Sequence, residues 1–286
     1  MDLLNQISDN SETLFLPLYA RAFEAKTKNP IIEDPKAIEI TEKLNDLFRD
    51  SDKRLHKKLR NGKLPSKLPI SLSLRSRKFD QYAINFMERH PDALIVSMGC
   101  GLDTRFERVD NGQAIWIDVD FPEVIEIRKT FFPESERKHF IGESVTSEEW
   151  IPRMHEYKDR PTLFIAEGLF MYLEEEDVKN LLLRIHDFFS YAELACEVTG
   201  KWIVKKMVKP SFRKRFQRKN YLGKDALFSY GVNDGHDFEA WHPDFKLLEE
   251  WTYFDEKHPK MGWMNWFGYF ELFRKVQWVV YYKISG

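Results

Sequence analysis

The strongest constraint on the fold is an alternation of short apolar runs with helical patterns between residues 91 and 200. The runs have the length of strands and are almost continuously apolar, as parallel strands covered on both faces are. We expect strands at residues 93–98, 114–119, 138–141, 162–166 and 193–198, and helices near 121–130, 147–155 and 175–189. This alternation predicts an α/β fold with a doubly wound, mostly parallel sheet that binds ligands at the carboxyl ends of its strands.

The flanking segments are expected to complete one domain, because no linker divides the chain. Residues 1–90 are predicted to form a helical cap. One of its helices follows a cap at Asn10 or Ser11, and a later one spans residues 79–89. Residues 201–245 interrupt the alternation and are predicted to be a substrate lid. Residues 246–286 are expected to complete the sheet with a last strand at 276–284.

Composition argues against several classes of protein. The 44 basic and 46 acidic residues give a net charge of −2, which argues against nucleic-acid binding as the main role. The two cysteines are too few for a disulfide framework, and His236 and His242 share a segment without a supporting ligand set, so we expect no metal. The first residues do not resemble a signal peptide, and no apolar run approaches the roughly 20 residues of a membrane span. We therefore expect a cytoplasmic protein that does not enter a membrane.

A basic cluster lies within the predicted lid. Residues 205–219 contain eight basic side chains and no acid, interleaved with Phe212 and Phe216. Two interpretations stay open: the exposed face of an amphipathic helix, or a lid or docking surface for an anionic partner. A nucleic-acid methyltransferase would depend on this cluster, and the salt dependence of binding would test it.

The turn after the first predicted strand is the strongest local signal. It reads SMGCGLDTR over residues 97–105. Gly99 and Gly101 allow the backbone to approach a ligand closely and to point amide N–H groups at it. Thr104 stands where a dinucleotide fingerprint has its third glycine, which argues against a nicotinamide cofactor.

Two carboxylates follow later strands. Asp120 ends the second strand, 19 positions after Gly101, where an acid can accept both hydroxyls of a ribose; the alternative is a cap on the next helix. Glu167 follows the strand at 162–166. It either contacts a cofactor, with Tyr172 on the substrate side, or is a buried acid paired within the fold.

Taken in order, these segments resemble the leucine carboxyl methyltransferase family. The motifs that carry the likeness are RSRKFD at 75–80, GCGLDTR at 99–105, DVDFP at 118–122 and AEGLFMYL at 166–173. Residues 16–24 and 34–37 are similar to the bacterial branch, which includes polyketide O-methyltransferases of the tetracenomycin type. The likeness covers roughly residues 12–200, and beyond them only the final strand resembles the family.

The resemblance implies a class I, Rossmann-like methyltransferase fold and S-adenosylmethionine as the cofactor. Arg75 would pair with the carboxylate of the cofactor's methionine portion, with Arg77 as the fallback and Arg21 as a second basic position. Gly99 and Gly101 would let their loop wrap the cofactor.

The remaining implied roles follow the later strands. Asp120 would hold the ribose, and Glu167 would lie beside the amino acid portion of the cofactor. The position that contacts adenine falls at Glu143-Ser144-Val145, where Ser144 replaces the expected Asp and Glu143 is the substitute. Tyr172 would face the methyl group as the catalytic residue.

The implied activity is O-methylation of a hydroxyl or carboxyl group on a small, polyketide-like molecule. A protein's C-terminal carboxylate and a non-catalytic regulatory role are the alternatives. Methyl transfer from an activated sulfonium mainly requires alignment of the acceptor and exclusion of water. This explains why the sequence shows neither a catalytic triad nor a paired general acid and base.

Overall fold

The computed structural model describes residues 14–214 and 228–286 of the chain. Within these residues, seven strands form one sheet in the order β3-β2-β1-β4-β5-β7-β6. The strands are β1 (Leu94–Met98), β2 (Ile115–Asp120), β3 (Lys138–Gly142), β4 (Thr162–Ala166), β5 (Ala192–Thr199), β6 (Lys246–Trp251) and β7 (Gln277–Ser285). Strands β1 to β5 pair in parallel, whereas β7 runs antiparallel to both β5 and β6. The predicted doubly wound, mostly parallel sheet is confirmed.

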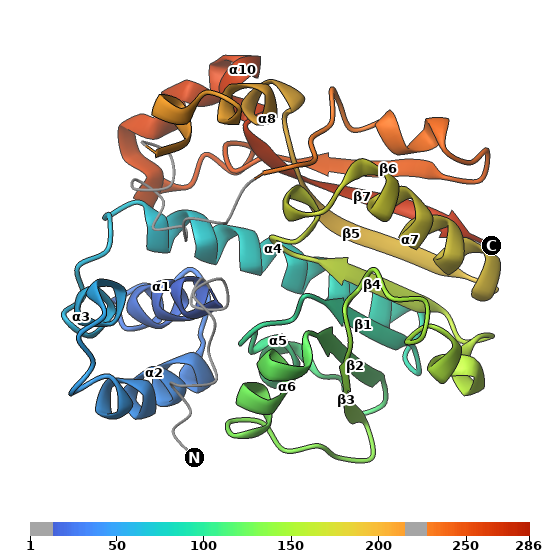
Figure 1. The fold of residues 1–286 in the computed structure, drawn as a ribbon, viewed down its shortest axis with the longest axis horizontal. Helices are drawn as coiled ribbons and strands as arrows, with labels where there is room; N and C mark the ends of the chain where they lie inside the picture. Colours follow the sequence, from blue (N-terminus) through green and yellow to red (C-terminus); the bar gives the residue numbers. More distant parts are fainter. Residues whose placement is uncertain (1–13, 215–227) are drawn as a thin grey trace.

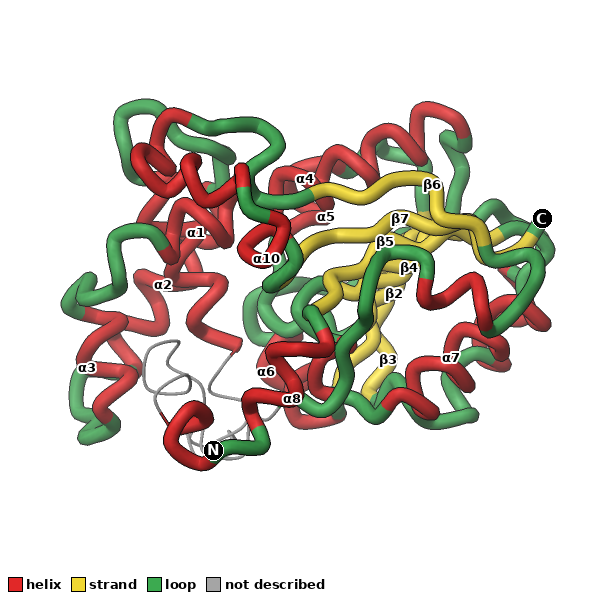
Figure 2. Tube along the Cα trace, turned by 90° about the horizontal axis from the view of Figure 1, so that it is seen from above, coloured by secondary structure: helices red, strands yellow, loops and turns green. Residues whose placement is uncertain are grey.

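Helices cover both faces of this sheet. Helix α4 (Leu68–Arg89) lies on one face and α7 (Glu175–Phe188) on the other, as Figure 2 shows. Alternate residues of β1 follow this division: Val96 packs in the core beneath α7, and Ile95 packs in the core beneath α4. The central strands are therefore buried on both faces, which explains their continuous apolar sequence.

A helical cap lies beside the sheet (Figure 1). It contains α1 (Phe15–Ala25), α2 (Pro35–Leu47) and α3 (Arg54–Arg60). Its core is apolar and aromatic, with Phe15, Tyr19 and Phe48 buried together. The Asp34 carboxylate caps α2 by accepting the amide N–H of Ala37 at 3.0 Å. The predicted caps at Asn10 and Ser11 lie outside the described residues.

Short helices connect the remaining elements. They are α5 (Arg105–Val109), α6 (Pro122–Lys129), α8 (Lys201–Met207), α10 (Glu271–Arg274) and the 3₁₀ segments Pro152–Tyr157, Phe170–Tyr172, Asp237–Ala240 and Pro259–Tyr269. None of the described helices is both long and apolar enough to cross a membrane.

Three details differ from the sequence expectations. The helix expected at 79–89 begins at Leu68, because Pro69 fits the first turn of a helix and does not interrupt it. Residues 147–155 form turns and the start of a 3₁₀ segment, not the predicted helix. Strand β6 was not predicted, because it is an edge strand whose side chains are mostly exposed.

The predicted lid segment contains two differently packed parts. Helix α8 places Ile203 and Met207 against Met171, just after β4. Farther along, Tyr230, Phe238 and Phe245 are buried in the core on the α7 face of the sheet. Of the basic cluster, Arg215, Arg218 and Lys219 lie outside the described residues.

Candidate active site

A cavity of about 370 Å³ opens at the carboxyl ends of β1, β2 and β4. Seven residues singled out in the sequence line it: Arg21, Arg75, Gly99, Gly101, Asp120, Glu167 and Tyr172. Because parallel strands end at the same edge of a sheet, the fold brings together residues up to 151 positions apart, from residue 21 to residue 172.

The glycine turn has a backbone that requires glycine. Gly99 and Gly101 have φ angles of +64° and +47°. A Cβ on Gly99 would also lie 2.9 Å from Leu169 Cδ1. The Arg128 guanidinium stabilises the turn by donating hydrogen bonds to the carbonyls of Gly101 at 3.0 Å and Asp103 at 2.8 Å. The turn is therefore held rigidly while it faces the cavity.

Asp120 is fixed at the end of β2 by two backbone amides. Its carboxylate oxygens accept the N–H groups of Gly101 and Phe121, each at 2.8 Å. Burial raises the pKa of Asp120 even though these hydrogen bonds lower it. A carboxylate has about four lone-pair sites, so two amide donors leave acceptor capacity for ligand hydroxyls.

Arg75 lies between two buried acids. Its Nε donates to Glu167 Oε1 and its Nη1 to Glu197 Oε2, both at 2.8 Å. Tyr253 donates to the other oxygen of Glu197 at 2.6 Å. Burial raises the pKa of Glu197, although Arg75 lowers it. Glu197 was not among the residues predicted from the sequence, because it is one of two acids in the buried strand β5 and nothing local sets it apart from Glu193.

Arg105 and Asp103 extend this charged group. Arg105 donates to Glu167 Oε2 at 2.5 Å and to Asp103 Oδ2 at 2.6 Å. Burial opposes ionisation of Asp103, but Arg105, Arg108 and Arg21 hold its pKa below the usual value. The other oxygen of Asp103, Oδ1, is buried and accepts no hydrogen bond from the described residues. Arg108 Nη2 and Arg21 Nη2 lie 3.5 Å and 3.9 Å from Oδ1, so this oxygen is ion-paired although no described residue donates a hydrogen bond to it.

Glu167 is ionised in the same surroundings. Burial would raise its pKa, but the guanidinium groups of Arg75 and Arg105 outweigh that effect and lower it. Ser76 also donates to Glu167 Oε1, at 3.2 Å. Glu167 is thus paired within the fold, as one of the two interpretations has it, and it also lines the cavity.

Tyr172 lies on the apolar side of the cavity. Its ring packs edge-on against Phe228, with the ring centroids 5.4 Å apart, and 38% of its surface is exposed. Desolvation raises the pKa of Tyr172 to about 12. The phenol is therefore protonated at neutral pH, where it can donate a hydrogen bond but is a poor general base.

Arg77 does not line the cavity. It pairs with Glu256 instead. Two positions along an α-helix correspond to a rotation of about 200° about the helix axis, so Arg77 and Arg75 lie on different faces of α4. Arg21 does line the cavity, and it binds the Asp34 carboxylate at 3.0 Å and the carbonyl of Leu102 at 3.1 Å.

The predicted adenine segment follows β3, one strand beyond Asp120, and is not part of the cavity wall. Glu143 pairs with Arg153 at 2.8 Å, and Ser144 shares a hydrogen bond with Thr146 at 2.8 Å. Val145 is buried in the core. The amide of Glu143 nevertheless donates to the carbonyl of Asp120 at 2.9 Å, so the segment lies beside the site.

Comparison with known proteins agrees with this architecture. Residues 15–186 match the family model described as leucine carboxyl methyltransferase. The chain belongs to that family. It is 31% identical over 245 residues to the tetracenomycin polyketide synthesis O-methyltransferase TcmP of Streptomyces glaucescens, covering 85% of this chain and 83% of TcmP.

Two further matches extend over most of the chain. An S-adenosyl-L-methionine-dependent methyltransferase of Gibberella zeae, dpfgK, is 26% identical over 286 residues, covering 96% of this chain and 91% of dpfgK. The crystal structure of a candidate methyltransferase from Thermobifida fusca has a TM-score of 0.50 at 15% identity, covering 93% of this chain and 94% of that one. The latter supports the fold alone.

Membership of this family makes the chain a methyltransferase that uses S-adenosylmethionine. The predicted family, enzyme class and cofactor are confirmed. The cavity fits the cofactor chemically, because the Asp120 carboxylate keeps acceptor capacity for ribose hydroxyls, and the ionised acids Asp103 and Glu167 in the wall suit a ligand with a positively charged sulfur and an ammonium group.

Proposed function

We propose that this leucine carboxyl methyltransferase family member methylates an oxygen of a small apolar molecule, and that this oxygen belongs to a carboxylate. TcmP, which is named as a polyketide O-methyltransferase, supports a small-molecule acceptor. The chemistry of the cavity wall supports the carboxylate.

The cofactor end of the cavity is assigned first. We propose that Asp120 accepts the ribose hydroxyls, that Asp103 accepts the ammonium group, and that Arg75 binds the carboxylate of the methionine portion. Among the described residues, Arg75 Nη2 has no hydrogen-bond acceptor, so it is available for that carboxylate. When bound, S-adenosylmethionine supplies a methyl group activated by a positively charged sulfur.

The ionisable residues of the cavity wall indicate which class of methyl acceptor the enzyme uses. Those among the described lining residues are Arg21, Arg75, Cys100, Asp103, Arg105, Asp120, Glu167 and Tyr172. The set contains no histidine. Burial raises the pKa of the Cys100 thiol, and Asp103 and Glu167 are engaged by arginines. Burial also raises the pKa of Asp120, but this carboxylate accepts two backbone amides and is assigned to the ribose. The described wall therefore offers no base on the acceptor side.

The lack of such a base distinguishes carboxylic acids from alcohols and phenols as methyl acceptors. A carboxylic acid, with an ordinary pKa of about 4, is ionised at neutral pH and presents a nucleophilic oxygen without help. An aliphatic alcohol or a simple phenol must lose a proton during the reaction, which normally requires a positioned base. The protein then needs only to align the carboxylate with the methyl group and to exclude water.

The other end of the cavity is suited to an apolar molecule. Leu68 and Leu72 line it from α4, and Tyr172 and Phe228 contribute further apolar surface. Helix α8 packs beside Met171, next to Tyr172, so we propose that α8 and the residues near Phe228 form the acceptor side, as a lid does.

An acceptor panel tests the proposal. The purified enzyme would be incubated with methyl-labelled S-adenosylmethionine and matched probes: a series of aromatic carboxylic acids including 2-naphthoic acid, the corresponding phenols including 2-naphthol, and a peptide that ends in leucine. We expect base-labile methyl esters of the carboxylic acids. Methylation of the phenols alone would contradict the carboxylate assignment, and methylation of the peptide alone would contradict a small-molecule acceptor.

A further inference from the structure

We infer that His186, His242 and Asp244 form a binding site for a divalent transition metal ion with the ligand preferences of zinc. The site is separate from the cofactor cavity. Helix α7 ends just before β5 begins, and Asp244 just precedes β6, so the three residues lie near the amino ends of these strands. The cavity lies at the opposite, carboxyl edge of the sheet.

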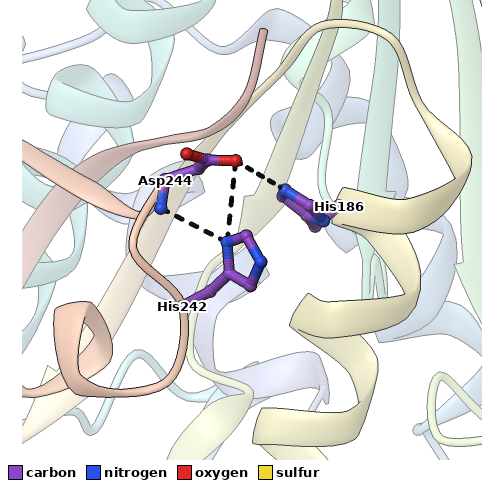
Figure 3. A group of neighbouring side chains, drawn as sticks. All are labelled: His186, His242 and Asp244. Carbon is purple, nitrogen blue, oxygen red and sulfur yellow. Dashed lines mark hydrogen bonds and ion pairs between the residues drawn. The ribbon is translucent and has the colours of Figure 1, made fainter.

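The fold brings these residues together from distant parts of the chain. His186 lies in the last turn of α7, and His242 and Asp244 lie in the loop before β6. Figure 3 shows one carboxylate oxygen of Asp244 facing both imidazole rings. The sequence pattern grouped His242 with His236 instead, and this is why no ligand set was expected.

The distances suit a tetrahedral ion. Asp244 Oδ2 lies 3.1 Å from His186 Nε2 and 3.8 Å from His242 Nδ1. The three potential ligand atoms all lie within 4.8 Å of one another. Zinc bonds of 2.0–2.1 Å in a tetrahedron place neighbouring ligand atoms about 3.3–3.4 Å apart. Small side-chain adjustments would therefore bring all three atoms into coordination.

A hydrogen bond beside the cluster orients the His186 ring for coordination. His186 Nδ1 lies 2.9 Å from Asp187 Oδ1, so the ring can donate there and present its Nε2 lone pair to a metal. Histidine ligands of metals commonly have such a carboxylate partner on the other nitrogen. His242 Nδ1 accepts the amide N–H of Asp244 at 3.2 Å, a long hydrogen bond that an ion at this nitrogen would replace.

Packing limits the movement of the rings. Their centroids are 3.9 Å apart, and both rings contact Phe245, which is fully buried. The Asp244 side chain is 62% exposed, so a water molecule can reach the fourth position. Two imidazoles and one carboxylate form a ligand set that zinc and neighbouring divalent ions accept. A bound ion would link α7 to the loop before the edge strand β6.

Calorimetric titration of the full-length, tag-free enzyme with Zn²⁺, after removal of metal by a chelator, tests this inference. We expect one ion per chain. Both His242→Gln and Asp244→Asn should weaken binding at least tenfold, and Asp187→Asn should weaken it by about 10- to 100-fold through loss of the ring's carboxylate partner.

His236→Gln is the matched control, because His236 is an exposed histidine that pairs with Glu239 near the same loop. It should bind Zn²⁺ as the unaltered chain does. Circular dichroism would establish that each variant is folded, and Asp244→Asn, at an exposed position, is the change least able to prevent folding. The inference would be overturned if the unaltered chain failed to bind Zn²⁺. It would also be overturned if the folded Asp244→Asn and His242→Gln variants bound Zn²⁺ as tightly as the unaltered chain does.

Discussion

Asp120→Asn is the substitution that most sharply separates binding from folding at the cavity. The carboxylate accepts two backbone N–H groups at 2.8 Å and, in our proposal, the ribose hydroxyls. Asn has the same size but only one acceptor oxygen. Losing hydrogen bonds to a charged acceptor costs about 1.5–3 kcal/mol, which corresponds to roughly a 10- to 150-fold weaker affinity.

The effect on stability should be smaller than the effect on affinity. One backbone donor loses its partner, at a cost of about 1–3 kcal/mol. Folding raises the pKa of Asp120, so its ionised form is less stable in the folded protein than in the unfolded chain. Removing that charge therefore offsets part of the cost.

Calorimetric titration with S-adenosylhomocysteine would measure the affinity, and urea unfolding would measure the stability. Glu126→Gln is the control, because Glu126 lies on the adjacent helix, is 63% exposed and pairs with Lys129. A folded Asp120→Asn variant with a Kd within twofold of the unaltered chain would refute the ribose assignment.

Three further substitutions have distinct expected outcomes. Gly99→Ala should destabilise the folded protein by about 1–2 kcal/mol, because residue 99 has a φ of +64° and an added Cβ would press on Leu169. It should also weaken S-adenosylhomocysteine binding. Thermal unfolding and calorimetry would detect the two effects, and an unchanged melting temperature would contradict the account. Glu167→Gln should cost about 3 kcal/mol at pH 7 in urea unfolding, because it leaves two buried guanidinium groups without this acid. Since folding lowers the pKa of Glu167, its contribution is fully present above the ordinary value and declines as pH falls from that value through the lowered one, so a deficit that did not shrink as pH fell below the ordinary value would contradict ion pairing. Tyr172→Phe should lower kcat without changing the pH profile between pH 6 and 9, because the phenol is protonated throughout; loss of a pH-dependent limb would instead indicate a base.

The central strands could be predicted from sequence because both their faces are buried. Strands β1, β2 and β4 all begin or end within one residue of the expected positions. Strand β6 could not be found in this way, since it lies at an edge and only Trp251 among its residues is buried. Helix α4 was shortened in the prediction because basic residues and Pro69 obscured its first turns.

The site was predicted where backbone chemistry leaves a local signal. Gly99, Gly101 and Asp120 follow strands and line the cavity as expected. Glu197 pairs with Arg75 across 122 positions, and such a pair has no local pattern. The same holds for His186 and Asp244, which are 58 positions apart.

A crystal structure with S-adenosylhomocysteine would test the assigned site most directly. We expect the ligand in the cavity at the carboxyl ends of β1, β2 and β4, with its ribose hydroxyls within hydrogen-bond distance of Asp120, its ammonium group at Asp103 and its carboxylate at Arg75. A ligand bound elsewhere, or bound in this cavity with its ribose away from Asp120, would contradict the account.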